Sequence, residues 1–252
     1  MTSPAWQLEG SLARLETAAL GATFDAARPS QGLTSISAAG WQLADLRLLA
    51  MELPPLVAAE ELALTECYAR GNDLVTAYQE RRAWPVEIDA TWRAVRSAGQ
   101  DGVLGAVELV ISVRTSLLES RPQLAITTTS PGTPALRLVD PATARYEPVS
   151  PAPGRAQAME PQTGPGCVVL RLPGVPLSYV EMVHPADFRG DRLAADGPEQ
   201  LELRHHLFQE SLEKGVLLRA RIRGVLVARD GDLPAAAACY AAFAAAEPPL
   251  GS

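Results

Sequence analysis

The sequence is poor in lysine, asparagine and cysteine. Lys214 is the only lysine among the 22 lysine and arginine residues, so any Schiff-base chemistry would have to use this one side chain, and a pyridoxal-phosphate enzyme is not expected. Arginine takes the surface positions that lysine occupies in most proteins. A cluster of arginines is therefore weaker evidence of an anion site here than in a protein with a balanced composition. The three cysteines form no CxxC pair, which excludes zinc-ribbon and thioredoxin-type sites. We expect Cys67, Cys167 and Cys239 to be buried as small hydrophobic side chains.

Long apolar runs and an excess of positive charge are missing as well. No segment approaches a run of roughly 18 apolar residues, so we expect no membrane span. The first residues contain neither a basic region nor an apolar core, so no secretory signal is expected and the cytoplasm is the expected location. The formal net charge of -7 argues against nucleic-acid binding, which relies on neutralising phosphates with excess cations. The sequence carries no signal for an oligomeric state.

The motifs of the common enzyme classes are also absent. The chain has no P-loop, no glycine-rich dinucleotide-binding motif after a predicted strand, no HExxH zinc motif and no GxSxG nucleophile elbow. Ser211 and Lys214 match the SxxK pattern of penicillin-binding proteins, but the companion patterns SDN and KTG are missing. No cofactor is predicted.

The segments that are present have the composition of short strands separated by proline and glycine. Residues Val86 to Val95 alternate, which places every second side chain on one apolar face. The tetrapeptide Arg70-Gly71-Asn72-Asp73 favours a hairpin turn, because glycine and asparagine tolerate positive φ. Further strands are predicted at Gln7–Glu16, Gly32–Ser37, Trp41–Met51, Leu62–Tyr68, Asp73–Tyr78, Ala106–Leu118, Gln123–Thr129, Cys167–Leu172, Ser178–His184 and Leu201–Phe208.

These patterns predict a mainly-β fold, an antiparallel β-sandwich or barrel with a short C-terminal helix. Asp232 is expected to cap this helix, and Pro234 lies in its first turn. The alternative is an α+β protein with helices at Leu56–Leu64 and Leu233–Ala246. We expect residues 1–252 to form one domain.

Residues 130–166 differ from the rest of the chain because they contain many prolines. We expect a long surface excursion with one short strand near Ala135–Val139. A structureless loop of this length is unusual. A mobile insertion is the simpler interpretation, and an arm that binds a partner is the alternative.

The stretch Leu212–Asp232 predicts a long strand with Arg219, Arg221 and Arg223 on one face. Three cations in a row would repel, so they need carboxylates from a neighbouring strand, solvent or an anionic ligand. Glu108 is one of four acidic residues on other predicted strands that are candidates for this pairing; the others are Glu87, Asp89 and Glu181. The face is therefore either a cross-strand salt-bridge surface or a site for an anionic or sugar-like ligand.

Two further sets of residues are candidates for a site. Trp92 beside Arg93 is a possible platform for a sugar ring, with a buried core tryptophan as the alternative. His205 and His206 must point to opposite faces if they lie on a strand. His184 with Asp187 or Glu181 and one of that pair has the residue types of a two-histidine, one-carboxylate metal site, but the spacing does not require one and no metal is predicted.

Three runs of sequence carry a resemblance to a known family. They are GLTSISAAGWQLADLRLLAMELP, ECYARGNDLVTAYQERRAWPVEIDATWRAV and LEKGVLLRARIRGVLVARDGD. In strand cadence they resemble a group of bacterial proteins with the galactose mutarotase-like β-sandwich. The resemblance implies carbohydrate binding, and the epimerases of that superfamily use a histidine acid and a glutamate base in a sandwich groove. Those motifs do not match here residue by residue, and His184 with Glu181, or His206 with Glu210, are candidates by residue type only.

The sequence thus leads to three hypotheses about function. The first is a protein that binds a carbohydrate or polyol across one sheet face, through Trp92, Arg93 and the arginines Arg219, Arg221 and Arg223. The second is a sugar epimerase or mutarotase-like enzyme that uses a His/Glu pair. The third is a structural or interaction protein whose proline-rich segment binds a partner.

Overall fold

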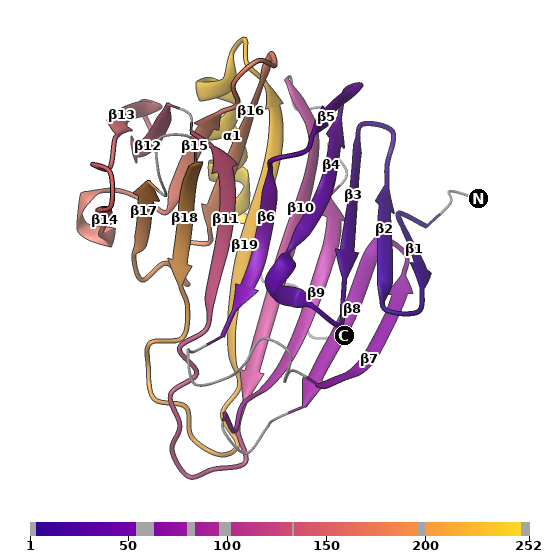
Figure 1. Ribbon diagram of the computed structural model, residues 1–252. Helices are drawn as coiled ribbons and strands as arrows, with labels where there is room; N and C mark the ends of the chain where they lie inside the picture. The colour runs from indigo at the N-terminus through magenta and orange to yellow at the C-terminus, as the bar shows by residue number, and fades with distance from the viewer. Residues whose placement is uncertain are drawn as a thin grey trace.

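Two stacked antiparallel sheets and one C-terminal helix make up the computed structural model (Figure 1). The structure describes residues 4–53, 63–79, 84–95, 102–132, 134–195 and 200–247. The predicted mainly-β antiparallel sandwich is confirmed. The predicted helix at Leu56–Leu64 falls largely on residues outside this description.

The first sheet follows the order β1-β2-β3-β4-β6-β11-β18-β17-β14, with β5 paired to β4. In Figure 1 it lies in front of the second sheet. Its strands are β1 (Trp6–Glu9), β2 (Leu12–Glu16), β3 (Leu20–Asp25), β4 (Leu33–Ala38), β5 (Trp41–Leu43), β6 (Arg47–Glu52), β11 (Ala125–Pro131), β14 (Ala156–Met159), β17 (Asp191–Ala195) and β18 (Gln200–His206).

The second sheet follows the order β13-β12-β15-β16-β19-β10-β9-β8-β7. Its strands are β7 (Ala63–Arg70), β8 (Asp73–Gln79), β9 (Glu87–Val95), β10 (Val103–Arg114), β12 (Ala135–Asp140), β13 (Arg145–Val149), β15 (Cys167–Arg171), β16 (Leu177–Val183) and β19 (Leu218–Ala228). Two 3-10 turns, η1 (Pro29–Gln31) and η3 (Pro161–Thr163), lie between strands.

Alternating side chains build the core between the sheets. In β9 every second residue is buried, as the sequence pattern predicts, and these residues pack into one large apolar cluster with both sheets. The second sheet packs against the first sheet with one face, and we call its opposite face the outer face. The β7–β8 hairpin turns at Gly71 and Asn72, where Gly71 has a φ of 61°, so the predicted turn is also confirmed.

The proline-rich segment contains the predicted short strand near Ala135–Val139, as β12, but it is more regular than the sequence predicts. It contains three strands, β12, β13 and β14, and the 3-10 turn η3. Pro148 is tolerated because β13 is the outermost strand of its sheet, where a missing N–H breaks no ladder. Pro148 lies within β13, and Pro134 directly precedes β12.

The C-terminal helix α1 (Asp232–Ala245) packs on the outer face of the second sheet through Cys239, Tyr240 and Phe243, which share one side of the helix as predicted. The predicted capping role of Asp232 is wrong. Gly231 occupies the N-cap, and the Asp232 carboxylate accepts hydrogen bonds from Arg171 and Ser178 on the sheet instead.

Two smaller expectations also need correction. The predicted strand from Leu212 begins only at Leu218, because residues 212–217 form a loop that pairs with the β10–β11 connection through Ser120. Cys167 and Cys239 are buried as expected, but Cys67 is only partly buried, because β7 is the outermost strand of its sheet. Among the described helices, none is long and apolar enough to cross a membrane.

Candidate functional site

Two polar regions stand out, and the first is enclosed between the sheets. His205 on β18 lies between Asp191 on β17 and Glu181 on β16 of the opposite sheet. Its Nδ1 is 2.5 Å from Asp191 Oδ1 and its Nε2 is 2.6 Å from Glu181 Oε1. All three side chains are at most 1% exposed. We call this group the inter-sheet triad.

The charges of the inter-sheet triad stabilise one another. Burial opposes a charged imidazole, but the two carboxylates outweigh it and raise the pKa of His205 to about 10. Burial raises the pKa of Asp191, and the imidazolium opposes this rise. The hydroxyls of Thr128, at 2.6 Å, and Tyr179 donate to the second oxygen of Glu181. A charged, enclosed histidine with both nitrogens engaged is a structural link between the sheets and has no access to a substrate.

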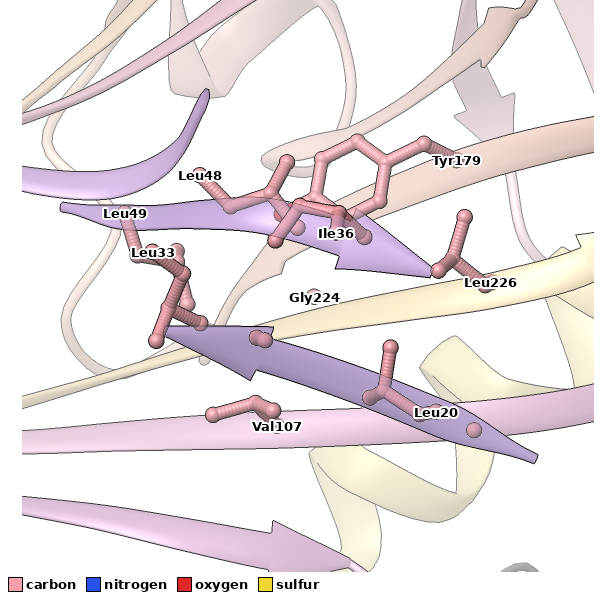
Figure 2. Close-up of a pocket in the computed structure, with 11 residues that line it drawn as sticks. Leu20, Leu33, Ile36, Leu48, Leu49, Val107, Tyr179, Gly224 and Leu226 are labelled. Atoms are coloured by element: carbon pink, nitrogen blue, oxygen red, sulfur yellow. The ribbon is translucent and has the colours of Figure 1, made fainter. Parts of the chain in front are cut away.

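An apolar space next to Tyr179 is too small for a sugar. Figure 2 shows Tyr179, Ile36 and Leu226 around it, with Gly224 between them. The cavity measures about 10 Å³, which is at the limit of what one water needs. Ligand pockets are larger by more than an order of magnitude, so this cavity is a packing defect of the core.

Gly224 on β19 is predicted to be sensitive to substitution. A Cβ at this position would lie 2.9 Å from Cε2 of Tyr179 and would also meet its hydroxyl. Gly224→Ala must displace the ring that donates to Glu181, so we expect it to lower the free energy of unfolding by about 1–3 kcal/mol. Urea unfolding measures this loss. A Gly224→Ala protein as stable as the parent would contradict the packing described.

The second polar region is a groove of about 720 Å³ on the outer face of the second sheet. Its floor crosses the neighbouring strands β7, β8, β9, β10 and β19. Partners in adjacent antiparallel strands point to the same face, so the strand register arranges the floor in rows. Three rows run across this face, and the groove lies along them; Glu108, Arg221 and Arg223 at the β10–β19 end of the rows lie outside it, under Phe243 of α1.

The rows alternate in character. The first is charged with alternating sign: Arg70, Asp73, Arg93, Glu108 and Arg223. The second is mostly neutral: Tyr68, Val75, Thr91, Val110 and Arg221. The third is polar again: Glu66, Ala77, Asp89, Ser112 and Arg219. An apolar-to-neutral stripe therefore runs across the sheet between two polar borders.

Ion pairs hold the polar borders in place. The Arg93 guanidinium donates to both oxygens of Asp73, at 2.8 and 2.9 Å, and this pairing raises the pKa of Arg93. Arg114, beyond the third row, bonds Glu87 at 2.6 Å and Asp89 at 3.1 Å. A fixed set of donors and acceptors on both sides of a neutral stripe can hold a ligand that carries many hydroxyls.

The arginines of β19 divide between two environments. Arg221 and Arg223 share the carboxylate of Glu108, at 3.0 and 2.5 Å, and Phe243 of α1 lies over both guanidinium groups. The prediction of a cross-strand salt-bridge surface that includes Glu108 is confirmed for these two. Arg219 bonds Ser112 at 3.1 Å and lines the groove.

The other candidate residues from the sequence lie in different parts of the structure. Trp92 is fully buried and packs on Phe24 with ring centroids 4.3 Å apart, so it is a core residue and the suggested sugar platform is not at this position. Arg93 lines the groove. Glu181 faces the core and pairs with His205, whereas His184 lies on the outer face against Phe243, so the structure does not bring Glu181 and His184 into one pair.

His184 lies at the end of the neutral row, where its backbone N–H donates to the Arg221 carbonyl at 3.0 Å. Its Nδ1 is 4.0 Å from Asp187 Oδ2. Burial and the cation of Arg221 lower the pKa of His184, so the imidazole is neutral near pH 7. His206 has a lowered pKa through burial and Arg204, while Glu210 pairs with Arg189.

Two groupings of residues were not predicted from the sequence. Glu181 and His205 were named as candidates, but not their association with Asp191 in the inter-sheet triad; its signal was that both residues occupy core-facing positions on strand faces that are otherwise apolar. The groove residues Tyr68, Asp73 and Thr91 had none, because their alignment depends on which strands are neighbours. In the described part of the chain, no group of three or more histidine, cysteine or acidic side chains is arranged to hold a metal ion.

Comparisons with known proteins identify the fold. No family model matches the sequence, and no curated protein matches it either. Among solved structures, a candidate aldose 1-epimerase from Klebsiella pneumoniae has a TM-score of 0.61 at 7% identity, over 98% of this chain and 90% of its own. The Slr1438 protein from Synechocystis has a TM-score of 0.59 at 11% identity, over 90% and 99%. A candidate aldose 1-epimerase from Escherichia coli has 0.54 at 8%, again over 90% and 99%.

These similarities extend over nearly the whole of both chains. At such low sequence identities they show a shared fold and nothing more. They agree with the antiparallel sandwich described above. The chain therefore shares the antiparallel β-sandwich fold of these structures.

Proposed function

We propose that this protein binds a carbohydrate in the groove on the outer face of its second sheet. The observation that carries the proposal is the neutral row that begins at Tyr68, bordered on both sides by rows of charged and polar groups. A sugar presents an apolar ring face and a rim of hydroxyls, which match such a floor. The fold supports the proposal, because several proteins that share it carry the name aldose 1-epimerase.

Arg219 is expected to contribute directly to this binding. It lies in the third row, bonds the Ser112 hydroxyl and lines the groove. Loss of a charged hydrogen-bond donor typically costs more than 1 kcal/mol, so Arg219→Ala is expected to bind about ten-fold more weakly. The ligand is found on an array of glucose, galactose, mannose and uronic acid glycans, and its affinity is then measured by titration calorimetry.

A matched variant distinguishes a local effect from a general loss of positive charge. Arg145 lies in the outermost strand β13, is exposed and pairs with Glu147, away from the groove. Arg145→Ala is expected to bind like the parent protein. Equal losses in both variants, or an array without any bound glycan, would refute sugar binding in the groove.

A second candidate function is sugar epimerisation or mutarotation, favoured by the place of His184. Proton transfer at a sugar needs an acid and a base within reach of one ring. His205 is enclosed, so it does not qualify, whereas His184 lies at the end of the neutral row with Asp187 nearby. Its imidazole is neutral, but Nδ1 accepts the Ala186 N–H at 3.3 Å and Nε2 is buried, so one of these nitrogens must first be freed before His184 acts as a base.

The prediction for this second function concerns a rate. If the protein catalyses mutarotation, polarimetry with freshly dissolved α-glucose or α-galactose will show faster interconversion of the anomers than buffer. His184→Ala is then expected to lower the rate by about 10²–10⁴-fold, the usual contribution of general acid–base catalysis. His206→Ala is the control and is expected to retain the rate. A rate that His184→Ala leaves unchanged would remove His184 from the mechanism.

A further inference from the structure

The length of the groove and its direction across the strands indicate the size of the ligand. The floor extends across five neighbouring strands, from β7 at the edge of the sheet to β19 near its middle. Neighbouring strands lie about 4.8 Å apart, so the axes of β7 and β19 are separated by about 19 Å across this floor. A single sugar ring would leave most of such a floor uncovered.

Apolar side chains mark both ends of the floor. Tyr68 on β7 is 44% exposed, and Leu217, directly before β19, is 50% exposed. Both line the groove, and both are among the few large apolar side chains that the described residues leave open to solvent. Large apolar groups exposed at a polar groove are typical of contact points for the apolar face of a ligand.

Polar groups border the floor on both sides. On one side the first row supplies Arg70 and the fixed pair of Arg93 and Asp73, and on the other the third row supplies Glu66, Asp89, Ser112 and Arg219. Hydrogen-bonding groups are thus repeated along the floor, from β7 to β19 in the third row, and do not converge on one point. This arrangement suits a ligand with a repeated pattern of hydroxyls.

From this geometry we infer that the groove takes an extended oligosaccharide, with one sugar unit on Tyr68 and another, several units along the chain, on Leu217. The inference rests on the proposed carbohydrate binding and specifies its substrate class. It differs from a site for one ring, in which a single aromatic contact and a converging set of polar groups would suffice.

A length series tests this inference. Linear glycans from monosaccharide to hexasaccharide, of the sugar that binds best on the array, are titrated by calorimetry against the full-length protein. We expect the tetrasaccharide to bind at least about ten-fold more tightly than the monosaccharide, because it reaches both apolar ends. Tyr68→Ala and Leu217→Ser are each expected to weaken tetrasaccharide binding by about ten-fold. Tyr68→Phe, which keeps the ring, is expected to retain it.

Trp41→Ala supplies the control, since Trp41 is a similarly exposed aromatic residue on the first sheet. It should leave every affinity unchanged. If the monosaccharide and the tetrasaccharide bind equally well, the groove holds a single ring, and the inference fails while carbohydrate binding stands. If none of the glycans binds, both fail together.

Discussion

His205→Ala is expected to lower the free energy of unfolding by about 3–5 kcal/mol, the usual cost of removing one partner from a buried charged group. The substitution would leave Glu181 and Asp191 enclosed between the sheets without the imidazolium that both contact, at 2.6 and 2.5 Å. Urea unfolding at neutral pH, followed by circular dichroism, gives the value. His206→Ala, next to it on the opposite face of β18, is the control and is expected to cost less than about 1 kcal/mol.

The same residue predicts a pH dependence. The pKa of His205 is about 10 in the folded protein and about 6.5 in an unfolded chain. The stabilisation from protonated His205 is therefore complete below about pH 6.5 and declines as the pH rises toward 10. The parent protein should lose stability over this window, and His205→Ala should lose markedly less. Parallel pH profiles for the two proteins would contradict a charged histidine between the sheets.

Glu108→Gln is expected to have the second largest effect, a loss of about 3 kcal/mol. Glu108 is the shared carboxylate of Arg221 and Arg223, and the side chains of Glu108 and Arg221 are 3% and 4% exposed. Glutamine keeps the size and polarity of the side chain but removes the negative charge, so two adjacent cations would face Phe243 without compensation. Thermal and urea unfolding measure the loss.

An exposed pair between the neighbouring strands β9 and β10 separates the effect of burial from that of charge. Glu87 pairs with Arg114 at 2.6 Å, and these side chains are 33% and 53% exposed. Surface pairs contribute little, so Glu87→Gln is expected to cost less than about 1 kcal/mol. If the two substitutions cost the same, enclosure of the Glu108 pair under α1 is not what makes it important.

Local patterns in the sequence predicted much of the fold. The alternation of Val86 to Ala94 placed β9 correctly, and the Arg70–Asp73 turn gave the β7–β8 hairpin. The short strand near Ala135–Val139 was predicted and is β12, whereas the edge strands β13 and β14 were missed, since a proline-rich composition such as that around Pro148 argues against strands unless they lie at a sheet edge. The start of β19 was misplaced because the apolar character of Val216 and Leu217 continues in a loop.

The candidate site was less predictable than the fold. Glu108 was among the predicted partners of the three arginines, because adjacent cations need carboxylates whichever strands turn out to be neighbours. The groove depends on long-range register, which joins Tyr68 through Val75 and Thr91 to Val110, and no short segment encodes that order of strands. Trp92 shows the reverse case: its place in the β9 alternation favoured the core, and the core reading rather than the suggested sugar platform is the one the structure has.

A crystal structure of the protein with the best-binding glycan of the array would test the central claim most directly. We predict that the sugar lies on the outer face of the second sheet, with ring faces over Tyr68 and the neutral row and hydroxyls bonded to Arg93, Asp89 or Arg219. A glycan bound on the first sheet, at the edge strands β13 and β14, or anywhere else away from this floor would contradict the account.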